Sequence, residues 1–362
     1  MQKGTKRRIG VLTGGGDCPG LNAAVRGVAK TAILKYGMEV LGVKDGYIGI
    51  IENKYQALSY EDVSGILTEG GTLLGASNKA NPFRYPYSSG KLRDVSSIVL
   101  RNVKMMKLDG LVCVGGDGTL NIAYKLYKKG INLVGLPKTI DNDVKETDVT
   151  VGFDSAVITA TEAIDKLHTT AQSHHRVMVI EVMGRYAGWL ALYAGVAGGG
   201  DIIIIPEIPY DIKKVCQKVI ERHKRGKRFS IVVISEGARP KAGQMVVKKM
   251  IKDSTDPVRL GGIGNKIAND IERITGLEAR VTVLGHLQRG GTPSPFDRIL
   301  ATRLGTFACD LVARREFGKM AALRGRYIKA VDLKSVVKGI KRVNQKDPII
   351  KSALDVGTSF GV

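Results

Sequence analysis

Two short acidic segments carry the residue types best suited to chemistry. Residues 115–119 read Gly-Gly-Asp-Gly-Thr, and residues 139–143 read Thr-Ile-Asp-Asn-Asp. Asp117 can hold Mg²⁺ directly or through water. Asp141 can take the proton of an acceptor hydroxyl, and Asp143 can help to position metal or water. Together the segments indicate phosphoryl transfer, although alone the first could be a capped turn and the second an Asx turn.

A glycine-rich segment lies near the N-terminus, where residues 14–20 contain four glycines. Glycines let backbone N–H groups approach a phosphate closely, and a helix expected at residues 21–35 adds partial positive charge at its N-terminus. A plain strand-to-helix turn is the alternative, but such a turn rarely needs this many glycines. The Walker A pattern does not occur in the sequence, which excludes a P-loop NTPase.

Basic residues flank several apolar runs further along the chain. Arg176 precedes one such run and Arg185 follows it, in the segment Met-Gly-Arg. Arg280 opens another run, which leads into Gly-His-Leu-Gln-Arg-Gly-Gly at residues 285–291. Arginine binds phosphate in a planar, bidentate way, and a carboxylate such as Glu236 can accept from sugar hydroxyls. Taken alone, each arginine is more often a surface ion-pair partner.

Short apolar runs alternate with amphipathic stretches along most of the chain. We expect strands at residues 9–12, 40–43, 111–114, 133–136, 177–182, 202–205 and 231–234, and from residue 280 onward. We expect helices at residues 21–35, 121–129, 156–171 and 188–197. This alternation predicts an α/β protein with a parallel sheet covered by helices on both faces. The glycine-rich and acidic loops follow strands, so they should share the carboxyl edge where ligands bind.

Composition narrows the class of protein further. The net charge of +22 comes from 56 Lys and Arg against 34 Asp and Glu, spread along the chain with few aromatics among the basic clusters. This distribution argues against a specific nucleic-acid interface. The four cysteines form no CxxC pair and no zinc spacing, which favours a reducing compartment. Without an apolar run of about 18 residues, no membrane span is expected, and a cytoplasmic location follows.

The length of 362 residues suggests two domains. A loop of alternating charges ends near Thr150, and we expect the chain to change domain there. The tail after Lys334 is basic and only weakly periodic. We therefore expect that tail to be peripheral.

Taken in order, the segments Gly-Gly-Asp-Gly-Thr, Thr-Ile-Asp-Asn-Asp, Met-Gly-Arg and Gly-His-x-Gln-Arg-Gly-Gly resemble those of the 6-phosphofructokinase family, from about Ile9 to about Leu311. The resemblance implies the phosphofructokinase fold, with two Rossmann-like, three-layer α/β/α domains and mainly parallel sheets. It further implies Mg²⁺-assisted transfer from ATP to the 1-hydroxyl of fructose 6-phosphate, a step of glycolysis that gives fructose 1,6-bisphosphate. It also implies a larger donor domain of residues 1–150 plus about 287–335. A smaller sugar-phosphate domain would hold residues 151–286 plus the C-terminal tail.

The resemblance also implies roles for individual residues. The catalytic residues would be Asp141 as the base, Thr139, and Arg185 as a stabiliser of the transferring group, and the metal residue would be Asp117. Donor contacts would come from Gly15, Gly16, Asn78, Lys79, Gly116, Asp117, Gly118, Thr119 and Lys138. Sugar-phosphate contacts would come from Thr139, Ile140, Asp141, Arg176, Met183, Gly184, Arg185, Glu236, Arg280, His286, Leu287, Gln288 and Arg289.

The donor site carries a mixed signature. Family members that use ATP typically have glycine at the position of Gly118, whereas pyrophosphate users have aspartate, which fills the space of the nucleotide's α-phosphate. Lys138 stands where many pyrophosphate users have lysine and many bacterial ATP users have glycine. The pair resembles ATP users of a mixed type, so ATP is the expected donor and pyrophosphate the alternative. Asn78 stands where an arginine often holds donor phosphates, and Lys79 could substitute as a point charge.

Arg176 and Arg280 match positions that reach the site of a neighbouring subunit, which implies a homodimer or homotetramer.

Two other classes of protein compete with the phosphofructokinase interpretation. An NAD or lipid kinase shares Gly-Gly-Asp-Gly-Thr but not the three later segments. A non-enzymatic sugar-phosphate sensor or nucleic-acid-binding protein has only the basic charge in its favour, and it would not need Asp117, Asp141 and Asp143.

Overall fold

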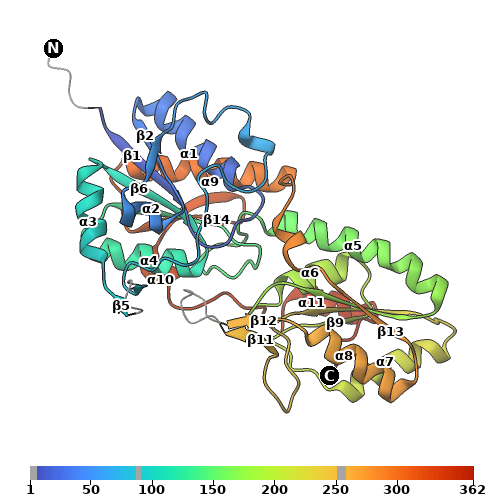
Figure 1. Ribbon diagram of the computed structural model, residues 1–362. Coiled ribbons are helices and arrows are strands. Elements are labelled where there is room, and N and C mark those ends of the chain that lie inside the picture. The colour runs from blue at the N-terminus through green and yellow to red at the C-terminus, as the bar shows by residue number, and fades with distance from the viewer. Residues whose placement is uncertain (1–5, 87–90, 251–257) are drawn as a thin grey trace.

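The computed structural model describes residues 6–86, 91–250 and 258–362. Two mainly parallel sheets lie side by side, and helices cover both faces of each (Figure 1). This arrangement confirms the predicted α/β class and its parallel sheets. The division of the chain into a donor and a sugar-phosphate domain stays a prediction.

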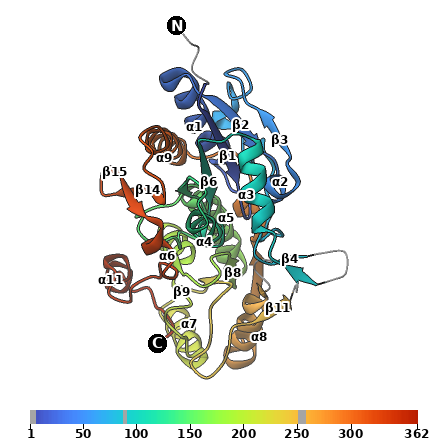
Figure 2. The same ribbon diagram turned by 90° about the vertical axis from the view of Figure 1, so that its left-hand side faces the viewer.

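The larger sheet has the strand order β15-β14-β7-β6-β1-β2-β3. Its strands are β1 (Arg8–Thr13), β2 (Glu39–Val43), β3 (Tyr55–Ala57), β6 (Gly110–Gly115), β7 (Leu133–Pro137), β14 (Lys319–Arg324) and β15 (Tyr327–Asp332). The five inner strands are parallel, and the edge strands β3 and β15 pair antiparallel at opposite sides of the sheet (Figure 2). Inner strands of such a sheet are buried on both faces, which explains their continuous apolar runs.

Helices cover the larger sheet on both faces. The helices are α1 (Leu21–Tyr36), α2 (Tyr47–Glu52), α3 (Ser96–Met105), α4 (Asp117–Lys128), α9 (Pro295–Ala313) and α10 (Leu333–Val336). Helices α1 and α9 pack on one face, where Val28 and Leu304 share a buried cluster with Val11. Helices α3, α4 and α10 pack on the other face around Leu12 and Leu111.

The smaller sheet is wholly parallel, with the order β13-β8-β10-β9. Its strands are β8 (Val177–Val182), β9 (Ile202–Ile204), β10 (Ser230–Ser235) and β13 (Ala279–Val283). The helices α5 (Phe153–His174), α6 (Trp189–Ala197) and α11 (Pro348–Asp355) pack on one face, and α7 (Ile212–Lys224) and α8 (Ile263–Thr275) pack on the other. Two short hairpins complete the described chain: β4 (Tyr85–Pro86) with β5 (Leu92–Arg93), and β11 (Val247–Met250) with β12 (Val258–Leu260).

Helix α4 and the C-terminal tail differ from the sequence-based expectation. Helix α4 begins at Asp117 and not at residue 121, because its first turn follows directly on the strand β6. The tail is not peripheral, since Ile350 and Phe360 are buried against the smaller sheet and Ser359 bridges Ile202 in parallel. The short helix α11 buries Ile350 and Ala353, although its periodicity in the sequence is weak.

No helix in the described ranges is both long and apolar enough to cross a membrane. All four cysteines are buried and free. This agrees with the absence of disulfide-type spacing in the sequence.

Candidate active site

Loops at the carboxyl ends of strands from both sheets line a cavity of about 580 Å³. Its lining residues are Gly15, Gly16, Asp17, Tyr47, Ser77, Asn78, Ala80, Gly116, Asp117, Gly118, Thr119, Ile122, Lys138, Thr139, Asp141, Asp143, Met183, Arg185, Glu236, Leu260, His286 and Arg289. A second cavity adjoins it, because both are lined by Gly15, Gly16, Asp17, Ser77 and Asn78. The first cavity thus gathers the glycine-rich loop, both acidic segments and the basic segments that the sequence singled out.

The glycine-rich loop after β1 is held open by backbone contacts and one lysine. Gly14 donates its N–H to the carbonyl of Val114 at 2.9 Å, and Gly15 has a positive φ of 80°. The buried Lys138 ammonium donates to the carbonyl of Gly14 at 2.9 Å and also to that of Gly16. Burial lowers the pKa of Lys138. Lys138 therefore lines the cavity while two of its three donors support the loop.

The first acidic segment joins β6 to α4 in a tight turn. The side chain of Thr119 packs so closely on Gly14 and Gly115 that a Cβ at either position would clash with it. The Tyr47 hydroxyl donates to the Thr119 carbonyl at 2.8 Å from behind. At Gly118, by contrast, an added Cβ would meet no atom of the described residues within 4 Å. The structure thus leaves open space beside Gly118, while it fills the space around Thr119.

The second acidic segment follows β7 and places two carboxylates in buried positions. Asp141 and Asp143 are 4% and 6% exposed, so both carboxylates have lost most of their contact with water. The Asp141 N–H donates to Thr139 Oγ1 at 3.2 Å, and Asp141 Oδ1 is buried without a hydrogen-bond donor among the described residues. A buried acceptor rarely goes unpaired, so we expect Oδ1 to accept a hydrogen bond from a bound ligand.

Burial sets the electrostatics of this pair. It raises the pKa of Asp141, and the nearby Arg289 and Arg185 oppose the shift. It raises the pKa of Asp143 well above the ordinary value, and Asp141 and Asp117 raise it further. Like charges at close range disfavour ionisation of both groups, whereas cations favour it. The cavity therefore contains two neighbouring carboxyls whose pKa values are raised mainly by burial.

The carboxylates that line the cavity suit Mg²⁺ only together with other ligands. Among the described residues, no group of three or more His, Cys, Asp and Glu could hold a metal by itself. Mg²⁺ usually binds through one or two carboxylates together with substrate phosphates and water. Asp117 is exposed and lines the cavity, and Asp141 lines the same cavity. This donor set fits an ion held largely by ligand phosphates.

The Met-Gly-Arg segment after β8 is locked by its backbone. Gly184 has φ 135° and Arg185 has φ 51°, so both lie in the left-handed region. The Arg185 N–H donates to Glu236 Oε1 at 3.3 Å, and a Cβ at Gly237 would collide with the Arg185 carbonyl. Burial raises the pKa of Glu236 to about 7, with a further contribution from Asp141. The segment after β10 therefore fixes Arg185 from behind.

His286 and Arg289 enter the cavity from the 3₁₀ helix η2 (Gly285–Arg289), which follows β13. Arg289 Nη1 donates to the carbonyl of Asp17 at 3.0 Å, so it crosses to the glycine-rich loop. A Cβ at Gly16 would clash with the same guanidinium. Arg289 thus links the two sides of the cavity.

Several residues predicted for the site lie elsewhere. Lys79 lines only the adjoining cavity. Ile140 points into the core and Gln288 is fully buried, whereas Leu287 is 70% exposed. Gly184 is buried behind the lining residues. The side chains of consecutive residues point in different directions, so a motif that reaches a cavity cannot direct all of its members toward it.

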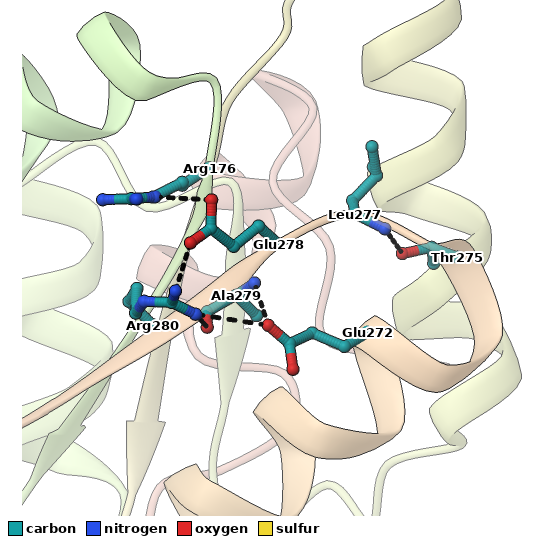
Figure 3. Close-up of polar contacts among 7 residues, drawn as sticks. All are labelled: Arg176, Glu272, Thr275, Leu277, Glu278, Ala279 and Arg280. Carbon is teal, nitrogen blue, oxygen red and sulfur yellow. Dashed lines mark hydrogen bonds and ion pairs between the residues drawn. The ribbon is translucent and has the colours of Figure 1, made fainter.

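Arg176 and Arg280 do not line the cavity of their own chain. Arg176 Nε lies 2.8 Å from Glu278 Oε2, and Arg280 pairs with the same carboxylate and, at 3.4 Å, with Glu272 (Figure 3). Arg176 precedes β8 and Arg280 is the second residue of β13. Both therefore lie at the amino ends of these strands, opposite the edge that forms the cavity. Their role toward a neighbouring subunit stays a prediction.

The sequence reasoning missed several lining residues, namely Asp17, Tyr47, Ser77, Ala80, Ile122 and Leu260. Asp17 follows the three consecutive glycines directly and could have been found from that loop. Tyr47, which begins α2, gave no signal because it reaches the cavity only through the packing of α2 against β1 and α4. Asp143 was considered for metal or water, and it does line the cavity.

Comparison with known proteins bears on this arrangement. A family model described as Phosphofructokinase matches residues 8–312. ATP-dependent 6-phosphofructokinase 2 of Clostridium perfringens is 52% identical, over 98% of this chain and 98% of that protein. ATP-dependent 6-phosphofructokinase of Spirochaeta thermophila is also 52% identical, over 100% of this chain and 99% of that protein.

Solved structures agree with the fold. Pichia pastoris phosphofructokinase in the T-state has a TM-score of 0.80 and 30% identity, and the match covers 98% of this chain and 37% of that chain. A pyrophosphate-dependent phosphofructokinase from Marinobacter aquaeolei also has a TM-score of 0.80, but at 21% identity it supports the fold alone. The family predicted from the sequence is confirmed: the chain belongs to the phosphofructokinase family.

Proposed function

We propose that the protein transfers the γ-phosphoryl group of ATP to the 1-hydroxyl of fructose 6-phosphate, giving fructose 1,6-bisphosphate and ADP in glycolysis. One observation carries the proposal: a single cavity joins the buried, unpaired Asp141 Oδ1 to glycine-rich loops on one side and to Arg185 on the other. The two relatives at 52% identity, both named as ATP-dependent 6-phosphofructokinases, support the same activity.

Asp141 would act as the general base. Its Oδ1 is buried and unpaired within the described chain, so it can accept the proton of the 1-hydroxyl as the new P–O bond forms. Thr139 Oγ1 accepts the Asp141 N–H, which fixes the start of the loop. Arg185 would stabilise the charge on the transferring group, because a guanidinium in a partly buried site interacts strongly with phosphoryl oxygens.

The sugar phosphate would lie on the side of the cavity formed by the smaller sheet. Met183, Glu236 and His286 line that side together with Arg289. Glu236 could accept from sugar hydroxyls, and the cations would bind the phosphate. Arg176 and Arg280, at the far edge of the sheet, would serve the site of a second copy in a homodimer or homotetramer.

Asp117 would hold Mg²⁺, with the donor phosphates supplying the other ligands. When bound, Mg²⁺ offsets the negative charge of those phosphates and lowers the barrier to attack. The glycine-rich loop and the N-terminus of α4 present backbone N–H groups to the same phosphates. Because glycolytic substrates are cytoplasmic, we place the reaction in the cytoplasm.

ATP is the proposed donor because the space beside Gly118 is open. Pyrophosphate remains the second candidate, and Lys138 is the observation that favours it. Yet the Lys138 ammonium donates to the carbonyls of Gly14 and Gly16, which leaves it one donor for a phosphate. This geometry supports a role in shaping the loop over a role in selecting the donor.

The test is an initial-rate assay of the purified protein with fructose 6-phosphate and Mg²⁺, with ATP or pyrophosphate supplied at equal concentration. We expect ATP to give a kcat/KM at least about tenfold higher, a difference of about 1.4 kcal/mol in transition-state binding. Higher turnover with pyrophosphate would favour the second candidate. No turnover with either donor would refute the proposed activity.

A further inference from the structure

A short C-terminal segment, residues 340–345, contacts the loop that carries Asp141. Ile340 bridges Val144 in antiparallel fashion, and the Lys341 N–H donates to the Asp143 carbonyl at 2.7 Å. The backbone of this segment thus pairs with the acidic loop, although the two are far apart in sequence.

The Lys341 side chain binds the same loop from beneath. Its Nζ donates to Asn142 Oδ1 at 2.9 Å, to the Thr147 carbonyl at 2.9 Å and to the Asp148 carbonyl at 2.8 Å. These three bonds use every donor of the ammonium group. Asn142 has φ 51°, a conformation that persists in a non-glycine residue only where its surroundings enforce it. Lys341 therefore supplies part of that enforcement directly beside Asp141.

The same segment also binds the start of α6, just after the Met-Gly-Arg loop. The Trp189 indole N–H donates to the Lys341 carbonyl at 3.0 Å, and Lys341 Nζ lies 5.4 Å from the Trp189 ring centroid. The Val343 N–H donates to Glu207 Oε1 at 3.0 Å, and the same carboxylate accepts the N–H of Gly188. Lys341 thus binds the acidic loop directly and is bound by Trp189, the residue that follows the loop bearing Arg185.

We propose that Lys341 is a positioning residue that fixes the loop bearing Asp141 relative to the loop bearing Arg185. Lys341 touches neither cavity, so it acts through Asn142, Asp143 and Trp189. The consequence for the reaction rests on the proposed function, in which Asp141 and Arg185 act on the same phosphoryl group. A displacement of about 1 Å between such groups lowers the rate by roughly 100-fold.

The test compares Lys341→Met with wild type and with Lys351→Met. Lys351 is a matched control on the same tail, because it lies on α11 with an exposed side chain and pairs with Asp355 across the helix surface. Two readouts are measured on the full chain: steady-state kinetics with ATP and fructose 6-phosphate, and amide hydrogen exchange of residues 141–150 and 188–190 without ligands.

We expect Lys341→Met to lower kcat about 10- to 100-fold while KM for ATP changes by less than about threefold, since the donor loops are not touched. Exchange should accelerate in both loops, and Lys341→Arg should restore part of kcat. Lys351→Met should match wild type in both readouts. An unchanged kcat with unchanged exchange in Lys341→Met would overturn the proposal, as would faster exchange confined to the tail.

A second variant keeps the test decisive if Lys341→Met does not fold. Trp189→Phe removes the indole N–H that binds the Lys341 carbonyl and keeps a smaller aromatic ring at this position, and it should accelerate exchange at residues 188–190 with a smaller loss of kcat. Wild-type-like exchange in a folded Trp189→Phe would count against the tie between the loops. If wild type shows no fructose 6-phosphate kinase activity, the proposed function fails, while the exchange result still decides the positioning role.

Discussion

The two sides of the cavity that we propose for the donor and for the sugar phosphate are built in different ways. On the donor side, glycine-rich turns after β1 and β6 present backbone groups, and Lys138 and Thr119 stabilise those turns from within the chain. On the sugar side, charged side chains from segments far apart in sequence converge, and Arg176 and Arg280 lie at the opposite edge of the sheet. The proposed donor side is thus built mostly from backbone groups of turns that distant side chains support, whereas the proposed sugar side is built mostly from charged side chains.

The loop after β7 lies between the two sides and belongs to neither. It carries the buried carboxyls of Asp141 and Asp143, whose pKa values are raised by burial. Its position therefore decides whether a donor and an acceptor bound on separate sides can react. The following predictions test this contrast.

The largest effect is expected for Asp141→Ser. Loss of a positioned base should reduce kcat by about 10²–10⁴, with KM for both substrates changed only modestly, because neither binding side is altered. Steady-state kinetics with ATP and fructose 6-phosphate provide the measurement. Asp165→Ser, at an exposed site on α5, is the control and should behave as wild type. A near-normal kcat in Asp141→Ser would remove Asp141 from the role of base.

Gly237→Ala tests the sugar side alone. The added Cβ must displace the Arg185 carbonyl, and a shift of the Arg185 loop should lower kcat/KM for fructose 6-phosphate by roughly 100-fold. ATP binding, measured by calorimetry without the sugar, should stay close to wild type. If ATP binding and sugar-phosphate turnover were lost in parallel, the two sides would not be separable in the way described.

Gly118→Asp tests the donor side alone. A carboxylate in the open space beside Gly118 should repel a nucleotide phosphate, so kcat/KM for ATP should fall about tenfold or more. Gly118→Ala is the matched control, since its Cβ would meet no described atom within 4 Å and should preserve ATP use. Equal losses in both variants would point to backbone distortion and not to charge.

The smallest effect concerns Glu236 and pH. Burial raises its pKa from 4.5 to about 7 in the folded protein. Its contribution to the free energy of unfolding is therefore present below pH 4.5 and is lost as pH rises through 7. Urea unfolding of the ligand-free protein at pH 5 and pH 8 measures this loss of unfolding free energy. Glu236→Gln should make the loss smaller by about 1–3 kcal/mol. Parallel pH profiles of variant and wild type would contradict the shift.

The sequence predicts the donor side better than the rest of the site. Glycines and acids that directly follow apolar runs identify local turns, and those turns occur where expected. The amino-end positions of Arg176 and Arg280 agree with the sequence, in which Arg176 precedes one apolar run and Arg280 opens another, whereas the cavity forms where strands end. The resemblance alone assigned them to a site.

Other features could not be predicted because they depend on distant contacts. The Lys138 ammonium is directed to Gly14 and Gly16 only because β1 and β7 flank β6 in the sheet. Lys341 reaches Asn142 across 199 positions. The start of α4 was missed since glycines at positions 116 and 118 disfavour a helix, and the tertiary turn overrides that preference.

The central claim is that the loop bearing Asp141 joins a nucleotide to a sugar phosphate. The most direct measurement is ³¹P NMR of the purified protein with ATP, fructose 6-phosphate and Mg²⁺. The account predicts that the γ-phosphate signal of ATP is replaced by the 1-phosphate signal of fructose 1,6-bisphosphate. Release of inorganic phosphate alone, or transfer to another hydroxyl, would contradict it.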